Sequence, residues 1–540
     1  MCRTWNMKVP KKLEGEGLLD YATRLSEVYA SHFDLRARKP KGQFFTPRQI
    51  AAYMASLSNI RDDAIRLLDP GAGTGVLSAA FCERLLENDR TTDLTIDAYE
   101  SDSDLLPFLR ETLRSCKMSL KRKGHRVRCN VRGDDFILVN QGRLWKTDLF
   151  RSDEADTSYD AVVCNPPYYK LNKNSPEAIA MQELVCGQPN IYSLFMALSA
   201  SMLRPGGEMI FITPRSFCSG LYYQRFLEWF LKKIRISHIH VFESRKEIFD
   251  KDGVLQENII IKAERPDGAD RTRTLSVSWS KNRLFQHVKT LKAKAADAVC
   301  RKNGRVFVRI PTSRLDTDIL HVVDSWPNTL ESLGLGISTG PVVAFRARQY
   351  LQPSMNASRE SVPLLWMNNI RGMRIVWPLP ETGKPIAIRV CDRTRPLLLQ
   401  VKNYVLLKRF SSKEQKRRLY AAVSTKSDFP YRLVGIENHL NYIHRPNGNL
   451  SIDEAFGVAG LLNTALIDRY FRSLNGNTQV NANDIRSVPF PDLRDVERIG
   501  RNIRRLQESR SSLSPDEIVS DVLEIDGDIS RRLNKAEMLR

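Results

Sequence analysis

The four residues Asn165-Pro166-Pro167-Tyr168 combine groups that can act on an exocyclic amine. Two consecutive prolines fix two φ angles and remove two backbone N–H donors, which leaves carbonyl oxygens without partners. The Asn165 side-chain oxygen and the Pro166 carbonyl oxygen could then accept hydrogen bonds from one NH2 group, with the Tyr168 ring as a flat face beside it. The alternative interpretation is a Pro-Pro turn that only ends a strand.

A glycine-rich segment, Asp69-Pro70-Gly71-Ala72-Gly73-Thr74-Gly75, has the character of a nucleoside-binding turn. Glycines allow the backbone to bend sharply and to approach a ligand closely. The G-x-G-x-G spacing, with no P-loop lysine after it, argues against a nucleoside triphosphate. Glu100 ends the next predicted strand, where its carboxylate could accept both ribose hydroxyls. The alternatives are a tight strand-to-helix turn and an ordinary exposed glutamate.

These residues follow strands in a pattern of alternating strands and helices. Strands are expected at 65–69, 94–100, 126–131, 159–164, 208–213, 237–242 and 258–263, and helices at 76–86, 104–120, 191–203 and 221–234. This alternation is typical of a doubly wound α/β sheet, in which ligands bind at the carboxyl ends of the strands. The predicted fold class is therefore α/β, with a Rossmann-like sheet that is followed by a mixed α+β region.

Together the motifs resemble the gamma-class adenine-N6 DNA methyltransferases of restriction–modification systems, the TaqI-like group, over about residues 40–495. The matching pieces occur in that family's order. They are Gly42-Gln43-Phe44-Phe45-Thr46-Pro47, Asp69–Gly75, Glu100, Gly133-Asp134-Asp135-Phe136, Asn165–Tyr168, Glu247-Ile248-Phe249 before Asn258-Ile259-Ile260-Ile261, Gly435-Ile436-Glu437-Asn438, Asn475-Gly476-Asn477-Thr478-Gln479-Val480-Asn481 and Val488-Pro489-Phe490-Pro491. The resemblance implies a class I methyltransferase sheet, mostly parallel with one antiparallel strand, and a C-terminal target-recognition domain.

The resemblance also implies roles for individual residues. S-adenosyl-L-methionine would be the cofactor, bound by Thr46, Pro47, Asp69, Gly71, Gly73, Gly75, Glu100, Asp135 and Phe136. Asp135 would contact the amino group of the cofactor's adenine, with Asp134 as the alternative, and Phe136 would stack on that ring. The catalytic set would be Asn165, Pro166, Pro167, Tyr168 and Phe249, with the target base held between Tyr168 and Phe249.

Adenine N6 is a poor nucleophile because its lone pair is delocalised into the ring, so the enzyme must activate it. Two acceptors would localise that lone pair and stabilise the positive charge that develops as the methyl group arrives. Because a sulfonium is already an excellent leaving group, we expect no metal ion. The base must leave the duplex before it can react. Cytosine N4 would suit the same acceptors.

The charge of the chain favours a polyanionic partner. Its 540 residues include 83 Lys and Arg against 62 Asp and Glu, a net charge of +21. Twelve basic residues and one acid, Asp297, lie in 271–314, and a second basic cluster lies in 408–418. These clusters are either solvated faces or phosphate contacts, and we interpret Arg417 and Arg418 as backbone contacts or a solvated helix face. The predicted partner is double-stranded DNA, with candidate base readers Arg346, Arg348, Asn368, Asn369, Arg371, Asn438, Asn441 and Asn477.

The expected domains are an N-terminal helical extension (1–40), a catalytic domain (41–270), a basic linker (271–315), a target-recognition domain (316–495) and a helical tail (496–540). No apolar run approaches the roughly 18 residues that cross a bilayer. Nine scattered cysteines without a CxxC pair indicate neither a zinc site nor a disulfide framework. We expect a bacterial, cytoplasmic, nucleoid-associated monomer.

Two other functions fit part of the pattern. An Asn-Pro-Pro-Tyr enzyme could methylate a protein glutamine, whose amide presents a similar NH2 group, but it would not need a large basic second domain. A DNA-recognition protein with a vestigial cofactor fold would not need both an intact glycine-rich loop and the tetrapeptide. The first 40 residues are too few to hold a nuclease, so a cognate restriction endonuclease would be a separate chain.

Overall fold

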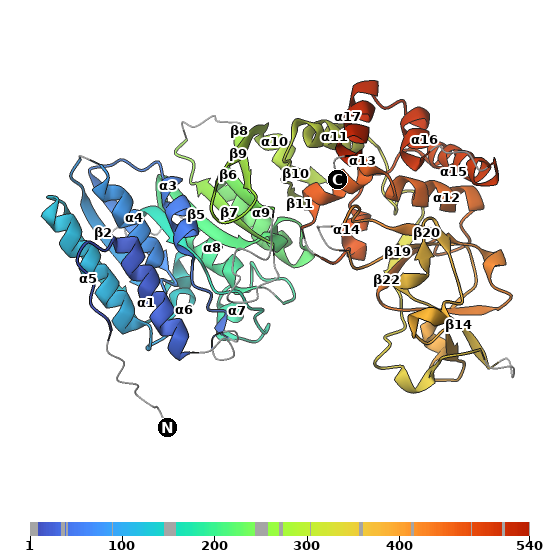
Figure 1. Cartoon of the computed structure of the whole chain (residues 1–540), viewed down its shortest axis with the longest axis horizontal. Helices are drawn as coiled ribbons and strands as arrows, with labels where there is room; N and C mark the ends of the chain where they lie inside the picture. Colours follow the sequence, from blue (N-terminus) through green and yellow to red (C-terminus); the bar gives the residue numbers. More distant parts are fainter. Residues whose placement is uncertain are drawn as a thin grey trace. The chain divides into compact units, whose positions relative to one another are not determined.

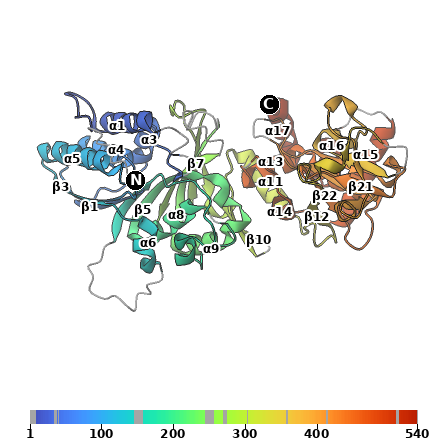
Figure 2. The same ribbon diagram turned by 90° about the horizontal axis from the view of Figure 1, so that it is seen from below.

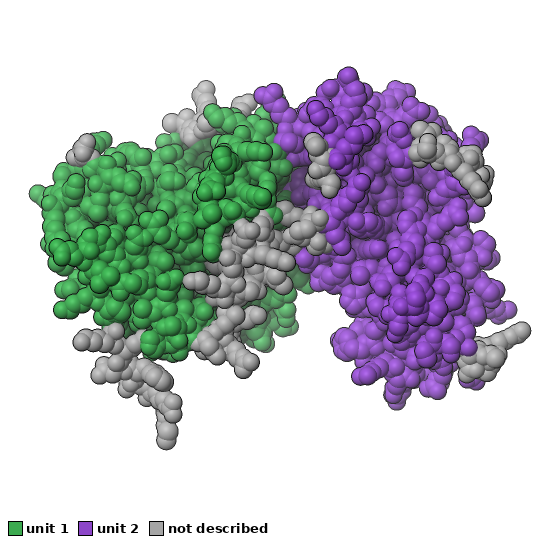
Figure 3. Space-filling model, viewed as in Figure 1, with its two compact units in different colours: residues 1–312 green, residues 313–540 purple. Residues whose placement is uncertain are grey.

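The computed structural model describes residues 9–33, 38, 41–88, 90–144, 158–188, 190–243, 257–268, 274–302, 304–355, 360–411, 415–476, 478–509 and 514–538. The chain divides into two compact units, residues 1–312 and 313–540, which are coloured separately in Figure 3. No helix in the described ranges is both long enough and apolar enough to cross a membrane.

Unit 1 is built on one large sheet, which has nine strands in the described residues (Figure 1). In spatial order the strands are β3 (Arg126–Arg132), β2 (Asp93–Tyr99), β1 (Ala64–Pro70), β4 (Tyr159–Cys164), β5 (Leu203–Pro214), β7 (Asn258–Glu264), β6 (Arg235–Phe242), β8 (Thr274–Ser280) and β9 (Lys289–Lys294). Strands β1 to β5 pair in parallel, and β7 runs antiparallel between β5 and β6. This is the class I methyltransferase sheet, and the predicted fold class is confirmed.

Helices cover both faces of this sheet (Figure 2). One face carries α1 (Leu18–His32), α3 (Arg48–Ser56), α4 (Val76–Leu86) and α5 (Leu106–Arg122), and the other carries α6 (Phe136–Asn140), α8 (Ile191–Met202) and α9 (Gln224–Lys233). The short α7 (Pro176–Ala180) follows the tetrapeptide. Because the central strands are covered on both sides, they are apolar at nearly every position: all six residues of β4 are buried.

The N-terminal segment is part of this unit rather than an extension from it. Tyr21, Leu25 and Tyr29 of α1 are almost fully buried, in a cluster with Leu105 and Phe108 of the α5 region. The backbone N–H of Leu19 also donates to Glu83 Oε2 of α4 at 3.0 Å.

The predicted basic linker over 271–315 is wrong, because most of this stretch is folded. Strand β8 pairs in parallel with β6, and β9 pairs antiparallel with β8. They are followed by α10 (Ala295–Ala298), β10 (Val299–Lys302) and β11 (Arg305–Val308). The strands were missed because lysines and arginines occupy the exposed positions, while Leu275, Val277 and Ala293 are buried in the alternation typical of strands.

Unit 2 contains two smaller sheets and a group of helices. One sheet has the order β12 (Gly336–Thr339), β22 (Leu440–His444), β19 (Tyr404–Lys408), β20 (Ala421–Ser424), β16 (Arg374–Ile375) and β15 (Ile370–Arg371). The other has the order β13 (Leu351–Gln352), β17 (Ala387–Arg389), β14 (Ser361–Leu365), β21 (Leu433–Ile436) and β18 (Leu398–Gln400). The helices are α11 (Arg314–Asp324), α12 (Ile452–Leu462), α13 (Ala465–Leu474), α14 (Ala482–Arg486), α15 (Leu493–Ser509), α16 (Pro515–Val522) and α17 (Gly527–Met538).

The predicted C-terminal tail belongs to the core of unit 2. Helix α15 packs on α12 so closely that a Cβ atom added to Gly457 or Gly500 would lie 1.9 Å from a backbone oxygen of the other helix. Val496, Ile499 and Ile503 of α15 are buried in this contact. The boundary placed before residue 496 therefore falls inside a packed helix pair.

The interpretation of Arg417 and Arg418 as solvated or DNA-contacting residues is also wrong. Only 1% of Arg418 is exposed, and its guanidinium donates to Ser411 Oγ at 3.0 Å and to the Asn475 carbonyl at 3.3 Å. Arg417 forms an ion pair with Asp516 at 3.0 Å. The cluster looked like a basic surface because the carboxylate that neutralises Arg417 lies about 100 residues away in the sequence.

Two of the candidate base readers are buried asparagines with backbone partners. The Asn441 side chain is fully buried and donates to the Val480 carbonyl at 2.8 Å. Asn369 is also buried, and its amide donates to the Val376 carbonyl at 2.6 Å. Both residues are structural and are therefore removed from the candidate base readers. Asn477 lies outside the described residues.

Candidate active site

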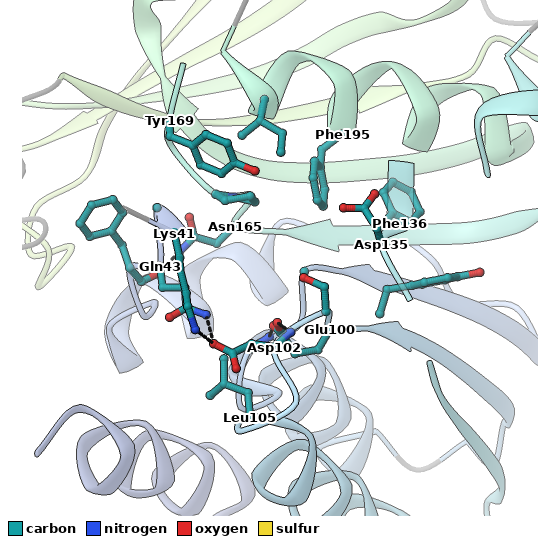
Figure 4. Close-up of a pocket in the computed structure, with 18 of the residues that line it drawn as sticks. Lys41, Gln43, Glu100, Asp102, Leu105, Asp135, Phe136, Asn165, Tyr169 and Phe195 are labelled. Carbon is teal, nitrogen blue, oxygen red and sulfur yellow. Dashed lines mark hydrogen bonds and ion pairs between the residues drawn. The ribbon is translucent and has the colours of Figure 1, made fainter. Parts of the chain in front are cut away.

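A cavity of about 600 Å³ opens at the carboxyl ends of β1, β2 and β4 (Figure 4). Its size is that of a small-molecule site. Among the predicted residues, those that line it are Gly71, Gly73, Glu100, Asp135, Phe136, Asn165 and Pro167. Gln43 and Phe44, from the predicted motif 42–47 but without an assigned role, also line it, and so do Lys41, Asp102, Tyr169 and Phe195, which were not predicted. In the described residues no cluster of His, Cys, Asp or Glu is arranged to hold a metal ion.

Glu100 is fixed in the cavity wall by two backbone amides. Its Oε2 accepts from the Gly73 N–H and its Oε1 from the Asp102 N–H, both at 2.8 Å. Burial raises the pKa of this carboxyl. Each carboxylate oxygen can accept a second hydrogen bond, so the fixed side chain suits a ligand with two adjacent hydroxyls.

Some residues of the glycine-rich loop line the cavity, and others support the loop from behind. Gly71 and Gly73 line the cavity with φ values of 72° and 58°. Gly75, with φ 85°, begins α4, where a Cβ atom would lie 3.0 Å from Leu109. Asp69 is buried behind the loop and accepts from Ser78 Oγ at 2.6 Å; burial raises its pKa to about 7. Asp69 and Gly75 therefore shape the loop from outside the lining.

Asp135 and Phe136 form the far end of the cavity. Asp135 caps α6, because its Oδ1 accepts from the backbone N–H groups of Ile137 and Leu138 at 2.9 Å. The Phe136 ring lies 5.2 Å from the ring of Phe195. Asp134 also lines the cavity, but the helix cap holds Asp135 in one orientation.

The segment 41–46 crosses directly over the tetrapeptide. Gly42 has φ 64°, and a Cβ atom there would lie 2.7 Å from the backbone nitrogen of Tyr168. On the opposite side, Lys41 Nζ and Gln43 Nε2 each lie 2.7 Å from Asp102 Oδ2 (Figure 4). The segment therefore contacts both the tetrapeptide and the loop after β2.

The orientation of the Asn165 amide is determined by its neighbours. Its Nδ2 donates to the Phe44 carbonyl at 2.8 Å and to Thr46 Oγ1 at 3.0 Å. A carbonyl oxygen can only accept, so the nitrogen must face Phe44 and Oδ1 must face the other way. The Tyr168 hydroxyl lies 2.7 Å from Oδ1. Two donors and one acceptor position are therefore used, which leaves one lone pair of Oδ1 without a partner in the described residues.

Tyr168 and Thr46 lie differently from what the sequence predicted. The Tyr168 ring is buried and stacks on Phe44 at 5.8 Å, and its hydroxyl also lies 2.9 Å from the Ile212 carbonyl. The adjacent Tyr169 lines the cavity instead. Thr46 is buried beside Asn165, and Pro47 begins α3; neither lines the cavity. Pro166 is buried, and Phe249 lies outside the described residues.

Comparison with known proteins decides the family. The model of the family described as Eco57I restriction-modification methylase matches residues 109–249. The Type II methyltransferase M.BsuBI of Bacillus subtilis is 35% identical over 473 residues, which cover 86% of this chain and 89% of that protein. This chain belongs to the Type II methyltransferases. The Type II methyltransferase M.PstI of Providencia stuartii is 31% identical over 508 residues, which cover 93% of this chain and 96% of that protein.

A more distant relative matches only part of the chain. The release factor glutamine methyltransferase of Bacteroides thetaiotaomicron is 25% identical over 206 residues, 36% of this chain and 61% of that protein. The match to the Type II methyltransferases, by contrast, extends over most of both units.

S-adenosyl-L-methionine is the cofactor of this Type II methyltransferase, and the cavity fits it. Glu100, Asp135 and Phe136, which were predicted to bind the ribose and the adenine, all line the cavity. The glycines of the loop after β1 leave room for a ligand to approach the backbone.

Proposed function

We propose that the chain methylates adenine N6 at a specific sequence in double-stranded DNA, as the protective half of a restriction–modification system. The observation that supports this most directly is the Asn165 amide, which offers one free acceptor position at the cavity. Together with the Pro166 carbonyl oxygen, it would accept from the two N–H bonds of one exocyclic amine.

The chain's residues would act by orienting the amine and by stabilising charge. Bound S-adenosyl-L-methionine supplies a methyl group on a sulfonium. Asn165 Oδ1 and the Pro166 carbonyl would hold the amine so that its lone pair is localised, and would stabilise the cation that develops on the nitrogen. Holding the reacting groups in line supplies much of the rate. The amine then loses its extra proton to water.

The cavity surroundings favour a flipped aromatic base over an extended side chain. Tyr169 and Phe195 line the cavity beside Asn165, and Phe44 forms part of its wall. Stacking of a base on aromatic rings contributes about 1–3 kcal/mol per base, which offsets the cost of leaving the duplex. Phe249, which lies outside the described residues, stays a prediction from the sequence as a stacking partner of the base.

The glutamine alternative is less well supported. The glutamine methyltransferase relative matches 36% of this chain, whereas M.BsuBI matches 86% of it. The second unit, 313–540, would have no role in methylating a protein side chain but would supply the contacts that select a DNA sequence.

The proposal predicts that Asn165→Ala loses at least about 100-fold in the single-turnover rate, since catalysis loses its acceptor. The affinity for S-adenosyl-L-methionine, measured by calorimetry, should stay within about twofold because Glu100 and Asp135 are untouched. The matched control is Asn174→Ala, an exposed asparagine nine residues along the chain, which should keep the full rate.

The product identifies the substrate. Sequencing with modified-base detection, on DNA from cells that express the protein, should find N6-methyladenine at one recurrent sequence. If the sequencing found N4-methylcytosine instead, the proposed target base would be wrong but the proposed role of the two acceptors would stand. Unmodified DNA together with methylated protein glutamine would overturn the proposal in favour of the alternative.

A further inference from the structure

One loop of unit 2 exposes an aromatic ring that nothing in the described structure covers. Phe345 is 76% exposed, whereas Val342 and Ala347 on either side of it are buried. Burying such a ring is normally favourable. A phenylalanine held outward between two anchored neighbours therefore suggests a contact surface rather than a core residue that points the wrong way.

The loop presents this ring rigidly. The Val342 N–H donates to the Ile436 carbonyl at 3.1 Å, and the Asn438 N–H donates back to the Val342 carbonyl at 2.9 Å. Gly340 lies so close to the Glu437 backbone that a Cβ atom would sit 2.3 Å from its oxygen. Little conformational entropy would be lost when the exposed ring binds a partner.

Two arginines lie over aromatic rings of this region. The Arg346 guanidinium lies 5.4 Å from the Phe345 ring, and the Arg389 guanidinium lies 5.6 Å from the ring of Tyr350. Arg346, Arg348 and Arg389 are exposed. The sequence contains no Asp or Glu between Glu331 and Glu360. We name Phe345, Arg346, Arg348, Tyr350 and Arg389 the aromatic–arginine surface.

The charges of this surface are unpaired, whereas several other arginines in unit 2 form ion pairs. Arg346, Arg348 and Arg389 have no carboxylate within ion-pair distance in the described ranges. Arginines with such partners include Arg417 (Asp516), Arg445 (Glu454), Arg469 (Asp316) and Arg472 (Asp468). Positive charge left without an internal partner, beside an exposed aromatic ring, is complementary to a polyanion with stacking bases.

We propose that the aromatic–arginine surface contacts the DNA substrate, with Phe345 stacked against an unstacked base step and the arginines on flanking phosphates. The inference rests on the proposed function and adds the surface through which unit 2 holds the duplex. Aromatic and apolar side chains that enter a base step partly unstack it, while arginines neutralise the backbone nearby. Stacking and phosphate contact leave different signatures in the salt dependence of binding.

The test measures DNA affinity by fluorescence anisotropy over a range of salt, on a duplex that carries the modified sequence. Phe345→Ala should weaken binding about tenfold, the scale of one lost base stack, with no change in the slope of log K against log salt. Phe345→Trp should retain binding. Arg346→Gln with Arg348→Gln should reduce that slope by about 2. Val376→Ala removes another exposed apolar side chain of unit 2 (42% exposed) and should bind as the wild type does.

The thermal unfolding of unit 2 should be unchanged in every variant, which reports its folding, and cofactor affinity, which depends on unit 1, should be unchanged as well. Phe345→Ala that binds DNA no more weakly than Val376→Ala would overturn the inference, and so would an unchanged salt slope in the double arginine variant. Loss of binding to anionic lipid vesicles, rather than to DNA, in Phe345→Ala would also overturn it. Wild-type protein that neither binds nor methylates DNA would instead refute the proposed function.

Discussion

The Asn165 amide is held by its neighbour Tyr168 and by Phe44 and Thr46, which lie about 120 positions earlier in the sequence. The Phe44 carbonyl and the Thr46 hydroxyl accept from its nitrogen, so its oxygen is directed away from them. The sequence interpretation assigned Thr46 to the cofactor, but its side chain is buried and does not line the cavity. Its role is better explained as a positioning residue for Asn165.

This positioning role predicts the behaviour of Thr46→Val. The variant keeps the shape of the side chain but removes the acceptor for Asn165 Nδ2, at a cost of about 1 kcal/mol in orientation. We expect the single-turnover rate to fall about fivefold while the Kd for S-adenosyl-L-methionine stays the same. Thr46→Ser, which restores the acceptor, should recover most of the rate. A weaker cofactor Kd with an unchanged rate would return Thr46 to the cofactor-binding set.

At the scale of elements, glycines allow the close packing of helices α12 and α15. A Cβ atom on Gly500 would lie 1.9 Å from the Asp453 carbonyl oxygen, a backbone atom that cannot move alone. One on Gly460 would lie 2.2 Å from Ile503 Cδ1, the end of a flexible side chain. A glycine-to-alanine substitution should therefore lower the stability of unit 2 more at Gly500 than at Gly460.

We predict that Gly500→Ala destabilises unit 2 by about 1–3 kcal/mol, because the helices must separate, and that Gly460→Ala costs less. Gly527→Ala, where no atom lies within 4 Å of the new Cβ, should be neutral or stabilising. Thermal unfolding gives the order, and cofactor affinity should stay constant because the cavity lies within unit 1. Equal losses at Gly460 and Gly500 would contradict the packing explanation.

Strands β1 to β7 of unit 1 and the position of the cavity at their carboxyl ends could be predicted because they follow from local patterns. Apolar runs such as 159–164 and the glycines after β1 carry their own signal. The fate of the basic stretches could not be predicted. Whether Arg418 is solvated or buried depends on Ser411, Asp468 and Asn475, and only the folded chain brings these together.

The same limit applies inside the site. The tetrapeptide and Glu100 were found because their chemistry is visible in single residues. Tyr169 and Phe195 were missed, since a tyrosine after a tyrosine and a phenylalanine in an apolar helix look like core residues. The motif 42–47 includes Phe44, but the sequence alone did not show that the Phe44 carbonyl accepts a hydrogen bond from the Asn165 amide.

At the scale of the whole molecule, a net charge of +21 does not by itself locate a DNA surface. Arginines that have carboxylate partners contribute to folding, and their charge is largely cancelled nearby. Those without partners, such as Arg346 and Arg348, project their charge into solvent, where it attracts phosphate. The distribution of paired and unpaired cations, rather than their number, therefore indicates where a polyanion binds.

The stability of unit 1 should depend on pH through groups buried in opposite protonation states. His240 is fully buried between Ser278 and Ser280, and burial lowers its pKa to about 3; Asp69 is buried with a pKa raised to about 7. In the unfolded chain His240 takes up a proton below about 6.5, so its contribution to stability is present above that pH and lost as pH falls. Asp69 has the opposite sign: its protonated form is favoured by folding, so its contribution grows as pH falls below about 7.

Variants separate the two groups. Between pH 7 and pH 5, His240→Asn should lose about 2 kcal/mol less stability than the wild type, because the unfolded chain no longer gains that proton. Asp69→Asn should lose more stability than the wild type over the same interval, because it cannot take up a proton in the folded state. Hydrogen exchange of peptides from β6 and β1 measures both at the positions concerned. If the two variants shift the pH dependence in the same direction, at least one of these groups is not buried in the protonation state assigned to it.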